Sequence, residues 1–299
     1  MGFGRYRFRR SFGNVSSQFR GARPDTYPLF SGLLDQYGGA SAAYSLRALS
    51  SGWLAGDVVE VRRSSFGGGD AQDTFTASQI TSGAMLAWVT EFSGTADGFV
   101  STWYDQSGNA NNATQIATTS QPKIVDAGAL VVNGIKFDGV DDSLDCGARI
   151  LELSAGAASI FAVSDSDGQT SVKKGYMCSE GDSVGPYSSN YIFGANFGDA
   201  GIWVNTTLVG NALSATGNQL ISTIYNGSTF QAYIDGATSG AASAATVNAE
   251  VTNTMIGSSG DGTTSFSGRK ISELIAYKVD QTANAAAIFA EINAHYAIY

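Results

Sequence analysis

Short strand-like segments separated by tight turns run through the second half of this 299-residue chain. The pair Asn226-Gly227 lies between two apolar runs and is a strong signal for a β-hairpin. Regular short strands with turn residues between them predict a sandwich of two antiparallel sheets. The expected strands are Ser159–Ser164, Tyr191–Ala195, Ile202–Asn205, Gln219–Tyr225, Phe230–Asp235, Thr254–Gly257 and Lys270–Lys278.

The composition agrees with one all-β domain. The chain has 37 glycines but only 4 prolines, and 14% of its residues are charged, which suits many tight turns and argues against disorder. No apolar run reaches membrane-spanning length. The two cysteines, Cys146 and Cys178, do not have the spacing of a metal site, and the sequence leaves open whether they pair.

The first half of the chain mixes helical and strand-like patterns. Leucine and alanine at helical spacing predict a short helix over Ala42–Leu49, after a glycine pair. A second helix is expected over Thr81–Phe92, and a last one over Thr282–His295 with Ile288, Phe289 and Ile292 facing inward. Alternating polarity predicts strands at Asp57–Arg63 and Ala129–Phe137, and an apolar run predicts one at Gly98–Tyr104.

A dense polar stretch, Trp103–Asn109, closes the strand at Gly98–Tyr104. Its aspartate, glutamine, serine and asparagine residues are typical of a loop whose side chains bind its own backbone. We therefore interpret it as a structural corner, in which Asp105 and Asn109 bond to the backbone and the sandwich takes its register.

Residues 1–30 are predicted to form an extended basic arm, and residues 31–299 the sandwich. Six arginines precede the first acid, Asp25, so residues 1–23 carry +6 and leave 11 basic against 26 acidic residues, or −15, in the rest of the chain. Such a body repels nucleic acid, whereas the arm favours an anionic partner. The arm is a solvated tail, a nucleic-acid or lipid contact, or an anchor across neighbouring subunits. The candidate docking residues are Arg5, Arg7, Arg9, Arg10, Arg20 and Arg23.

Several motifs follow one another in the order found in a known family. They are "AAYSLRAL", "VVEVRRSS", "WYDQSGNANNATQ", "QPKIV" and "FDGVDDSL", within about residues 33–146. The chain resembles the catalytic domain of fungal-type α-L-arabinofuranosidases and similar concanavalin A-like jelly-roll domains, many of them carried by bacteriophage structural proteins. The resemblance continues more loosely through "STIYNGSTFQAYIDG" and "IGSSGDGTTSFSGRKISELIAY".

The resemblance implies a site with two carboxyl groups, as a retaining glycosidase requires. Asp261, between two glycines, occupies a place similar to that of the family's acid/base aspartate. The stretch that matches the family's nucleophile strand, Gly201–Asn205, contains no acid, and the family's adjacent cysteine pair is also missing. These departures weigh against enzymatic activity, and Asp261 is the one catalytic candidate.

Two further groups of residues are candidates for binding. Asp138, Asp141, Asp142 and Asp145 could coordinate calcium, the only cofactor considered, although self-capping turns explain them better. Tyr187, Tyr191 and Trp203 could stack on sugars, although core packing is the commoner role of such residues. A lone histidine, His295, supports no catalytic triad.

From the resemblance and the charge division, the expected function is a structural protein of a bacteriophage virion. It would be a capsid decoration, head-fibre or tail-attached subunit at the virion surface, present in many copies or as a homo-oligomer. The arm would dock on other virion proteins and the lectin-like sandwich would face outward toward host glycans, without membrane insertion. The alternatives are a glycoside hydrolase of arabinofuranosidase type and a calcium-dependent carbohydrate-binding module.

Overall fold

The structure is a computed structural model. It describes residues 30–64, 70–165, 174–180, 189–196, 199–204, 207–212, 217–250, 252–260, 262–264 and 266–299. Between residues 174 and 212 it describes the backbone and the buried side chains of Met177, Phe193 and Val204. These parts belong to a compact unit that runs from Ser31 to Tyr299. The arginines of the expected arm lie outside the described residues, so the role given to the arm stays a prediction.

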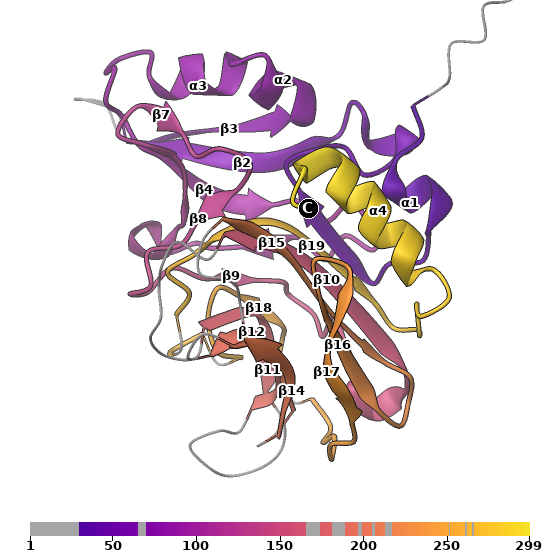
Figure 1. Cartoon of the computed structure of the whole chain (residues 1–299). Helices are drawn as coiled ribbons and strands as arrows, with labels where there is room; N and C mark the ends of the chain where they lie inside the picture. Colours follow the sequence, from indigo (N-terminus) through magenta and orange to yellow (C-terminus); the bar gives the residue numbers. More distant parts are fainter. Residues whose placement is uncertain are drawn as a thin grey trace, which may run out of the picture. The chain divides into compact units, whose positions relative to one another are not determined.

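The first sheet has the strand order β17-β16-β15-β10-β19-β1, and every neighbouring pair is antiparallel (Figure 1). β19 is the last strand in the sequence, yet it lies inside this sheet, between β10 and β1. The strands are β1 (Ala42–Ser45), β10 (Ala158–Asp165), β15 (Asn218–Tyr225), β16 (Phe230–Ile234), β17 (Ala237–Ser243) and β19 (Lys270–Tyr277).

The second sheet has the order β3-β2-β4-β5-β9-β18-β11-β12-β13-β14, again with antiparallel neighbours. Three short strands join the sheets, because β6 pairs with β4 and β7, and β8 pairs with both β6 and β19. Its strands and the joining ones are β2 (Asp57–Arg63), β3 (Ala71–Thr76), β4 (Gly98–Trp103), β5 (Ala113–Thr114), β6 (Lys123–Asp126), β7 (Ala129–Leu130), β8 (Ile135–Lys136), β9 (Leu144–Asp145), β11 (Lys174–Glu180), β12 (Ser189–Asn196), β13 (Asp199–Val204), β14 (Thr207–Ala212) and β18 (Met255–Ile256).

Short helices complete the chain, and the predicted all-β sandwich with a C-terminal helix is confirmed. No helix among the described residues is both long and apolar enough to cross a membrane. The helices are α1 (Leu33–Gln36), α2 (Ala77–Thr81), α3 (Ala84–Val89) and α4 (Ala285–Tyr296), with 3₁₀ turns at Ser51–Trp53, Thr118–Ser120 and Leu153–Ala155.

The apolar residues form two cores. The larger one contains fully buried side chains from both sheets, including Trp103 and Phe193. The smaller one lies between the first sheet and α1 and α4, where Phe161 of β10 packs edge-on against Phe289 at 5.7 Å. Ile288, Phe289 and Ile292 are all buried there, as predicted from the spacing of the last helix.

The helix predicted over Ala42–Leu49 is wrong, because Ala42–Ser45 is strand β1. All four residues are buried and pair along β19, with Ala43 opposite Ile275. Tyr44 belongs to the larger core and Ala43 to the smaller one, so β1 is covered on both faces. Ala42, Ala43 and Tyr44 form a continuous apolar run, and periodicity cannot distinguish such a buried strand from a buried helix.

Two other elements differ from their expected form. The helix expected over Thr81–Phe92 is shorter, α3 at Ala84–Val89, and a separate helix, α2, ends at Thr81. Phe92 lies beyond the end of α3 and is 62% exposed. The alternating run Ala129–Phe137 is interrupted between β7 and β8, where Asn133 has a φ of 55°. Asparagine tolerates this left-handed conformation, so the chain turns there.

The corner predicted at Trp103–Asn109 is confirmed. The Asp105 carboxylate is 1% exposed and accepts hydrogen bonds from the amides of Ala43 (2.8 Å), Ser107 (2.9 Å) and Asn111 (3.0 Å). Asn109 Nδ2 donates to the carbonyl oxygen of Ala40 at 2.9 Å. These bonds fasten the end of β4 to the start of β1, so the polar stretch joins the two sheets.

Candidate functional site

The outer face of the second sheet carries a continuous row of residues on adjacent strands. The Cα register pairs Glu60 with Thr102, Thr102 with Thr114, Thr114 with Asp145, and Asp145 with Met255. On the backbone the same row continues through Cys178, Ile192 and Trp203. The positions next to this row along each strand are buried in the larger core: Val59, Trp103, Ala113, Leu144 and Ile256. Because side chains alternate along a strand, the described side chains of the row, from Glu60 to Met255, face away from that core.

Glu60 lies at one end of the row and is oriented by hydroxyl groups. Its Oε2 accepts hydrogen bonds from Ser101 Oγ at 3.0 Å and Thr102 Oγ1 at 2.9 Å. The side chain is half-buried. A carboxylate held in this way at the edge of a polar face is suited to accept hydrogen bonds from sugar hydroxyls.

Asp145 occupies the row farther along, and it is also held in place. Its Oδ1 accepts the amide of Gly147 at 2.8 Å, and Asn253 Nδ2 donates to its Oδ2 at 3.4 Å. The sequence pattern grouped Asp145 with the three aspartates before it. The structure instead places it on the open face of β9, beside Met255 of β18.

Asp261, the catalytic candidate, lies outside the described residues, but both of its neighbours are described. The loop closes on itself through a hydrogen bond from Gly262 N to the oxygen of Ser259 at 2.9 Å. A Cβ atom on Gly262 would lie 3.1 Å from Cε of Met255. Gly262 is therefore next to Met255, whose register partner is Asp145.

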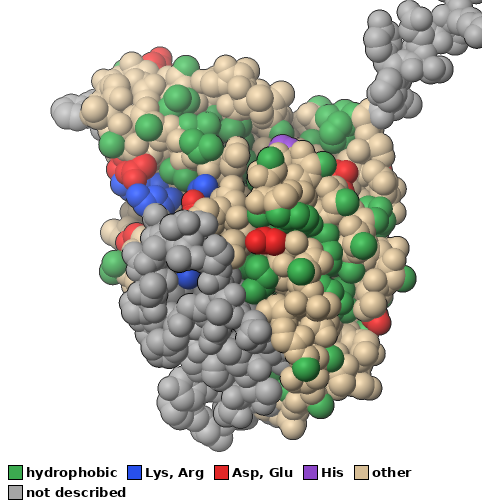
Figure 2. All heavy atoms as spheres, in the orientation of Figure 1, with side chains coloured by type: hydrophobic (Ala, Val, Ile, Leu, Met, Phe, Trp, Pro, Cys, Tyr) green, Lys and Arg blue, Asp and Glu red, His purple; other side chains and the backbone are tan. Residues whose placement is uncertain are grey.

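A charged pocket of about 190 Å³ opens near the other end of β4. Lys123 Nζ contacts Asp97 at 2.8 Å and Asp126 at 2.9 Å, and Lys136 Nζ contacts Asp126 at 2.8 Å. Figure 2 shows Lys and Arg side chains gathered beside Asp and Glu side chains over the region of β2, β4 and β8. The pocket is lined by Phe99, Thr119, Gln121, Lys123, Asp126, Lys136, Asp138 and Asp142.

Asp142 is the titratable group of this pocket. It is 5% exposed, and burial, followed by the neighbouring charge of Asp138, raises the pKa of its carboxyl to about 7. The amide of Asp138 donates to its Oδ2 at 2.9 Å. A carboxyl that exchanges its proton near neutral pH can serve as a general acid or base, so this pocket has acid–base capacity in addition to polar contacts.

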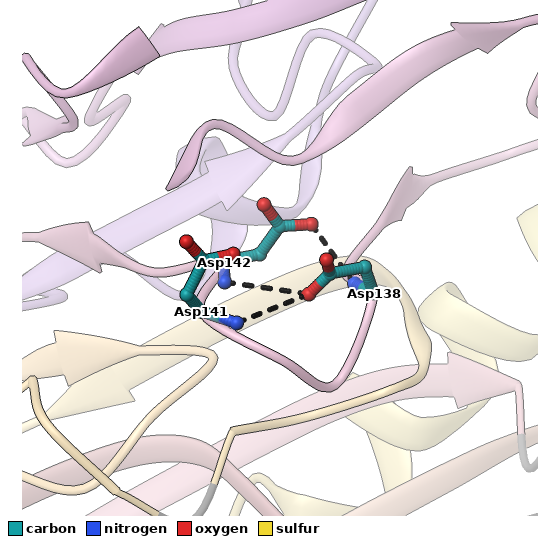
Figure 3. A group of neighbouring side chains, drawn as sticks. All are labelled: Asp138, Asp141 and Asp142. Carbon is teal, nitrogen blue, oxygen red and sulfur yellow. Dashed lines mark hydrogen bonds between the residues drawn. The ribbon is translucent and has the colours of Figure 1, made fainter. Parts of the chain in front are cut away.

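Three of the four aspartates proposed for calcium lie together, and the fourth does not (Figure 3). Oxygen atoms of Asp138, Asp141 and Asp142 all lie within 4.8 Å of one another, whereas Asp145 is not part of the group. Asp138 Oδ1 accepts the amides of Val140 (2.7 Å), Asp141 (3.3 Å) and Asp142 (3.4 Å). These bonds confirm the self-capping turn, while calcium binding by the three remaining residues stays a prediction.

The other candidate residues are only partly described. Tyr187 lies outside the described residues, and Tyr191 and Trp203 are placed by their backbone alone, in β12 and β13. Cys146 is a free, buried thiol and therefore does not pair with Cys178. Burial raises the pKa of the Cys146 thiol to about 12, so it is an inert core residue.

Neither protein-family models nor curated proteins match this sequence. Solved structures do match it in fold. A mutant of GH54 α-L-arabinofuranosidase soaked with 4-nitrophenyl α-L-arabinofuranoside gives a TM-score of 0.61 at 14% identity. A GH54 α-L-arabinofuranosidase soaked with a cyclic sulfate inhibitor gives 0.59 at 15%, and an arabinofuranosidase in complex with arabinofuranosyl-α-1,2-xylobiose gives 0.57 at 16%.

Each of these matches covers 89% of the present chain and 65% of the other, so the chain spans about two thirds of the length of those proteins. The chain is thus a β-sandwich domain with the fold of the GH54 arabinofuranosidases. At this level of identity the likeness defines the fold alone. The resemblance read from the motifs is confirmed to that extent, and the expected place in a virion stays a prediction.

Proposed function

We propose that this domain is a glycoside hydrolase that acts on arabinofuranosyl or related side chains of saccharides. The observation that carries the proposal is the fold shared with GH54 arabinofuranosidases over 89% of the chain. The polar row on the outer face of the second sheet supports it, because an open sheet face with oriented carboxylates and hydroxyls suits a saccharide. The proposal uses neither residues 1–30 nor the third of those proteins that this chain does not match.

In the proposed mechanism Asp261 is the general acid and Asp145 is the carboxylate opposite it. Glycoside hydrolysis needs two carboxyl groups on either side of the scissile bond, one to protonate the leaving oxygen and one to act as nucleophile or base. Gly201–Asn205, the stretch that matches the family's nucleophile strand, contains no acid, so it supplies no second carboxyl group. Asp145 is our candidate for that role from another strand, since it pairs with Met255, beside which Gly262 lies.

Replacing either carboxylate by its amide should lower hydrolysis of 4-nitrophenyl α-L-arabinofuranoside by about 100-fold or more, the usual contribution of a positioned acid or base. The variants are Asp145→Asn and Asp261→Asn, measured by nitrophenol release with thermal unfolding as a check on folding. Asp73→Asn, on the exposed edge strand β3, is the matched control and should keep full activity. An Asp145→Asn variant with more than half of the activity would reject the role given to Asp145, and an inactive wild type would reject the hydrolase.

If the domain binds saccharides without hydrolysing them, it is a lectin-like module. An inactive wild type that still binds arabinofuranosyl oligosaccharides in calorimetry would establish this. If that binding is unchanged by a chelator, the three clustered aspartates are turn residues and no calcium takes part.

The second candidate is the virion structural protein, anchored by its arm to other virion proteins with many copies in the particle. The division of charge favours it, since +6 on residues 1–23 against −15 on the rest suits docking of the arm on an anionic surface. Deletion of residues 1–23 should prevent incorporation into particles and leave a folded, soluble body by circular dichroism. Normal incorporation of the shortened chain would exclude this role.

A further inference from the structure

A second hollow, of about 550 Å³, opens beside the corner formed by the polar stretch after β4. It lies apart from the charged pocket and shares no residue with it. A volume of this size is within the range of ordinary small-ligand sites. None of the residues that line it is acidic, although the body has 26 acidic residues against 11 basic ones. Its polar lining consists of Ser41, Ser107, Asn109, Asn111, Arg149 and Lys278.

The two positively charged side chains that line this hollow differ in their ion pairing. Lys278 Nζ contacts Glu152 Oε2 at 2.8 Å. Arg149 is exposed and forms no ion pair or hydrogen bond with the described residues, in contrast to Arg47, Arg62 and Arg63, which are all in ion pairs. Both cations of the hollow lower the pKa of Glu152, Lys278 through a hydrogen bond and Arg149 through its charge alone. One positive charge therefore remains without a partner at this hollow.

The amide side chains of the hollow are fixed and offer acceptors. Asn109 Nδ2 donates to the carbonyl oxygens of Ala40 and Ser41, at 2.9 and 3.2 Å, and Asn111 Nδ2 donates to that of Ser41 at 2.9 Å. Ser107 Oγ donates to the buried Asp105 at 2.8 Å, so its direction is also fixed. With both amide nitrogens engaged by the backbone, each asparagine retains its side-chain oxygen for hydroxyl donors.

We propose that this hollow binds a carboxylate-bearing sugar, a hexuronate unit of an acidic saccharide. The guanidinium of Arg149 pairs with the sugar carboxylate in the two-pronged geometry that arginine forms with carboxylates. Lys278 adds a second positive group, and the asparagine oxygens accept the ring hydroxyls. The net negative charge of the body repels anions, and the unbalanced charge of Arg149 makes this hollow an exception to that repulsion. The choice of a sugar as the carrier of the carboxylate rests on the proposed glycoside function.

Trigalacturonate and its methyl ester form a matched pair of probes, because esterification removes the charge and leaves the hydroxyls in place. Calorimetry with the full chain at low ionic strength should give at least about tenfold tighter binding of the acid, the ratio that corresponds to about 1.4 kcal/mol. Arg149→Gln should abolish that preference, and Lys278→Gln should reduce it by a smaller factor. Lys136→Gln is the control, since that exposed lysine belongs to the charged pocket.

Equal affinity for the acid and its ester, or an unchanged preference in Arg149→Gln, would overturn the inference. Competition by inorganic phosphate as strong as by trigalacturonate would overturn the sugar acid as the ligand. The result is separable from the proposed function, because hydrolysis of a neutral arabinofuranoside is measured independently. Hydrolysis without discrimination between acid and ester would refute only this site, whereas discrimination without hydrolysis would refute only the hydrolase.

Discussion

Replacement of Asp105 by alanine is expected to destabilise the domain by about 3 to 5 kcal/mol, since each buried donor left without a partner costs about 1 to 3 kcal/mol. The carboxylate is 1% exposed and accepts hydrogen bonds from the amides of Ala43, Ser107 and Asn111 and from the Ser107 hydroxyl. These donors come from the start of β1 and from the corner after β4. Their loss affects the junction of the two sheets, where water cannot easily replace the carboxylate.

Urea unfolding followed by fluorescence measures this effect. Asp105→Asn retains one acceptor oxygen and should fall between alanine and the wild type. Asp73→Ala removes an exposed aspartate of β3 and should change stability by less than about 0.5 kcal/mol, as surface substitutions usually do. A loss below about 1 kcal/mol in Asp105→Ala would mean that the corner is not a structural junction.

Glu273→Ala is expected to have a similar effect, about 3 to 5 kcal/mol, because it removes the main partner of the largely buried Arg47, which then keeps only Glu291 at 3.3 Å. Glu273 of β19 is 1% exposed and accepts hydrogen bonds from Arg47 Nε at 2.8 Å and Arg47 Nη2 at 3.0 Å. Ser45 Oγ and the Tyr296 hydroxyl donate to the same carboxylate, at 2.8 and 3.2 Å. The group therefore joins β1, β19 and the end of α4.

Salt should distinguish this buried group from a surface ion pair. The cost of Glu273→Ala should be nearly the same at 0.1 M and at about 1 M salt, because buried pairs are screened little. The exposed pair between Glu152 and Lys278 is the comparison, and Lys278→Ala should cost about 0 to 1 kcal/mol and less at high salt. A Glu273→Ala cost that disappears in high salt would contradict the buried network.

The sequence predicts much of the fold, because runs of β-prone residues bounded by turn residues mark the strands. Asp57–Arg63 is strand β2 at the predicted bounds, and Lys270–Lys278 corresponds to β19 within one residue. The polar corner is also predictable, since an aspartate among turn residues bonds to its own backbone. β1 is not predictable in this way, because its four buried residues pair with a strand that lies far away in the sequence.

The candidate site depends more strongly on register than on local pattern. Asp138, Asp141, Asp142 and Asp145 form one acidic run in the sequence, yet pairing of β9 with β5 and β18 separates Asp145 from the other three. Its place beside Met255 could not be found without knowing that β18 is its neighbour. Arg149 likewise could not be assigned to a site from the sequence, because it lines one hollow with Asn109 and Asn111 only in the folded chain.

The position of β19 inside the first sheet has a consequence for the order in which this chain can fold. Ser41 and Ala276 share a hydrogen bond although they are 235 positions apart. β10, β1 and β8 all need β19 as a partner, so during synthesis their edges stay unpaired until the ribosome has passed Tyr277. Contacts this distant make folding slow, and open strand edges invite pairing with other chains. We therefore expect the nascent chain to be most open to mispairing before β19 has been synthesised.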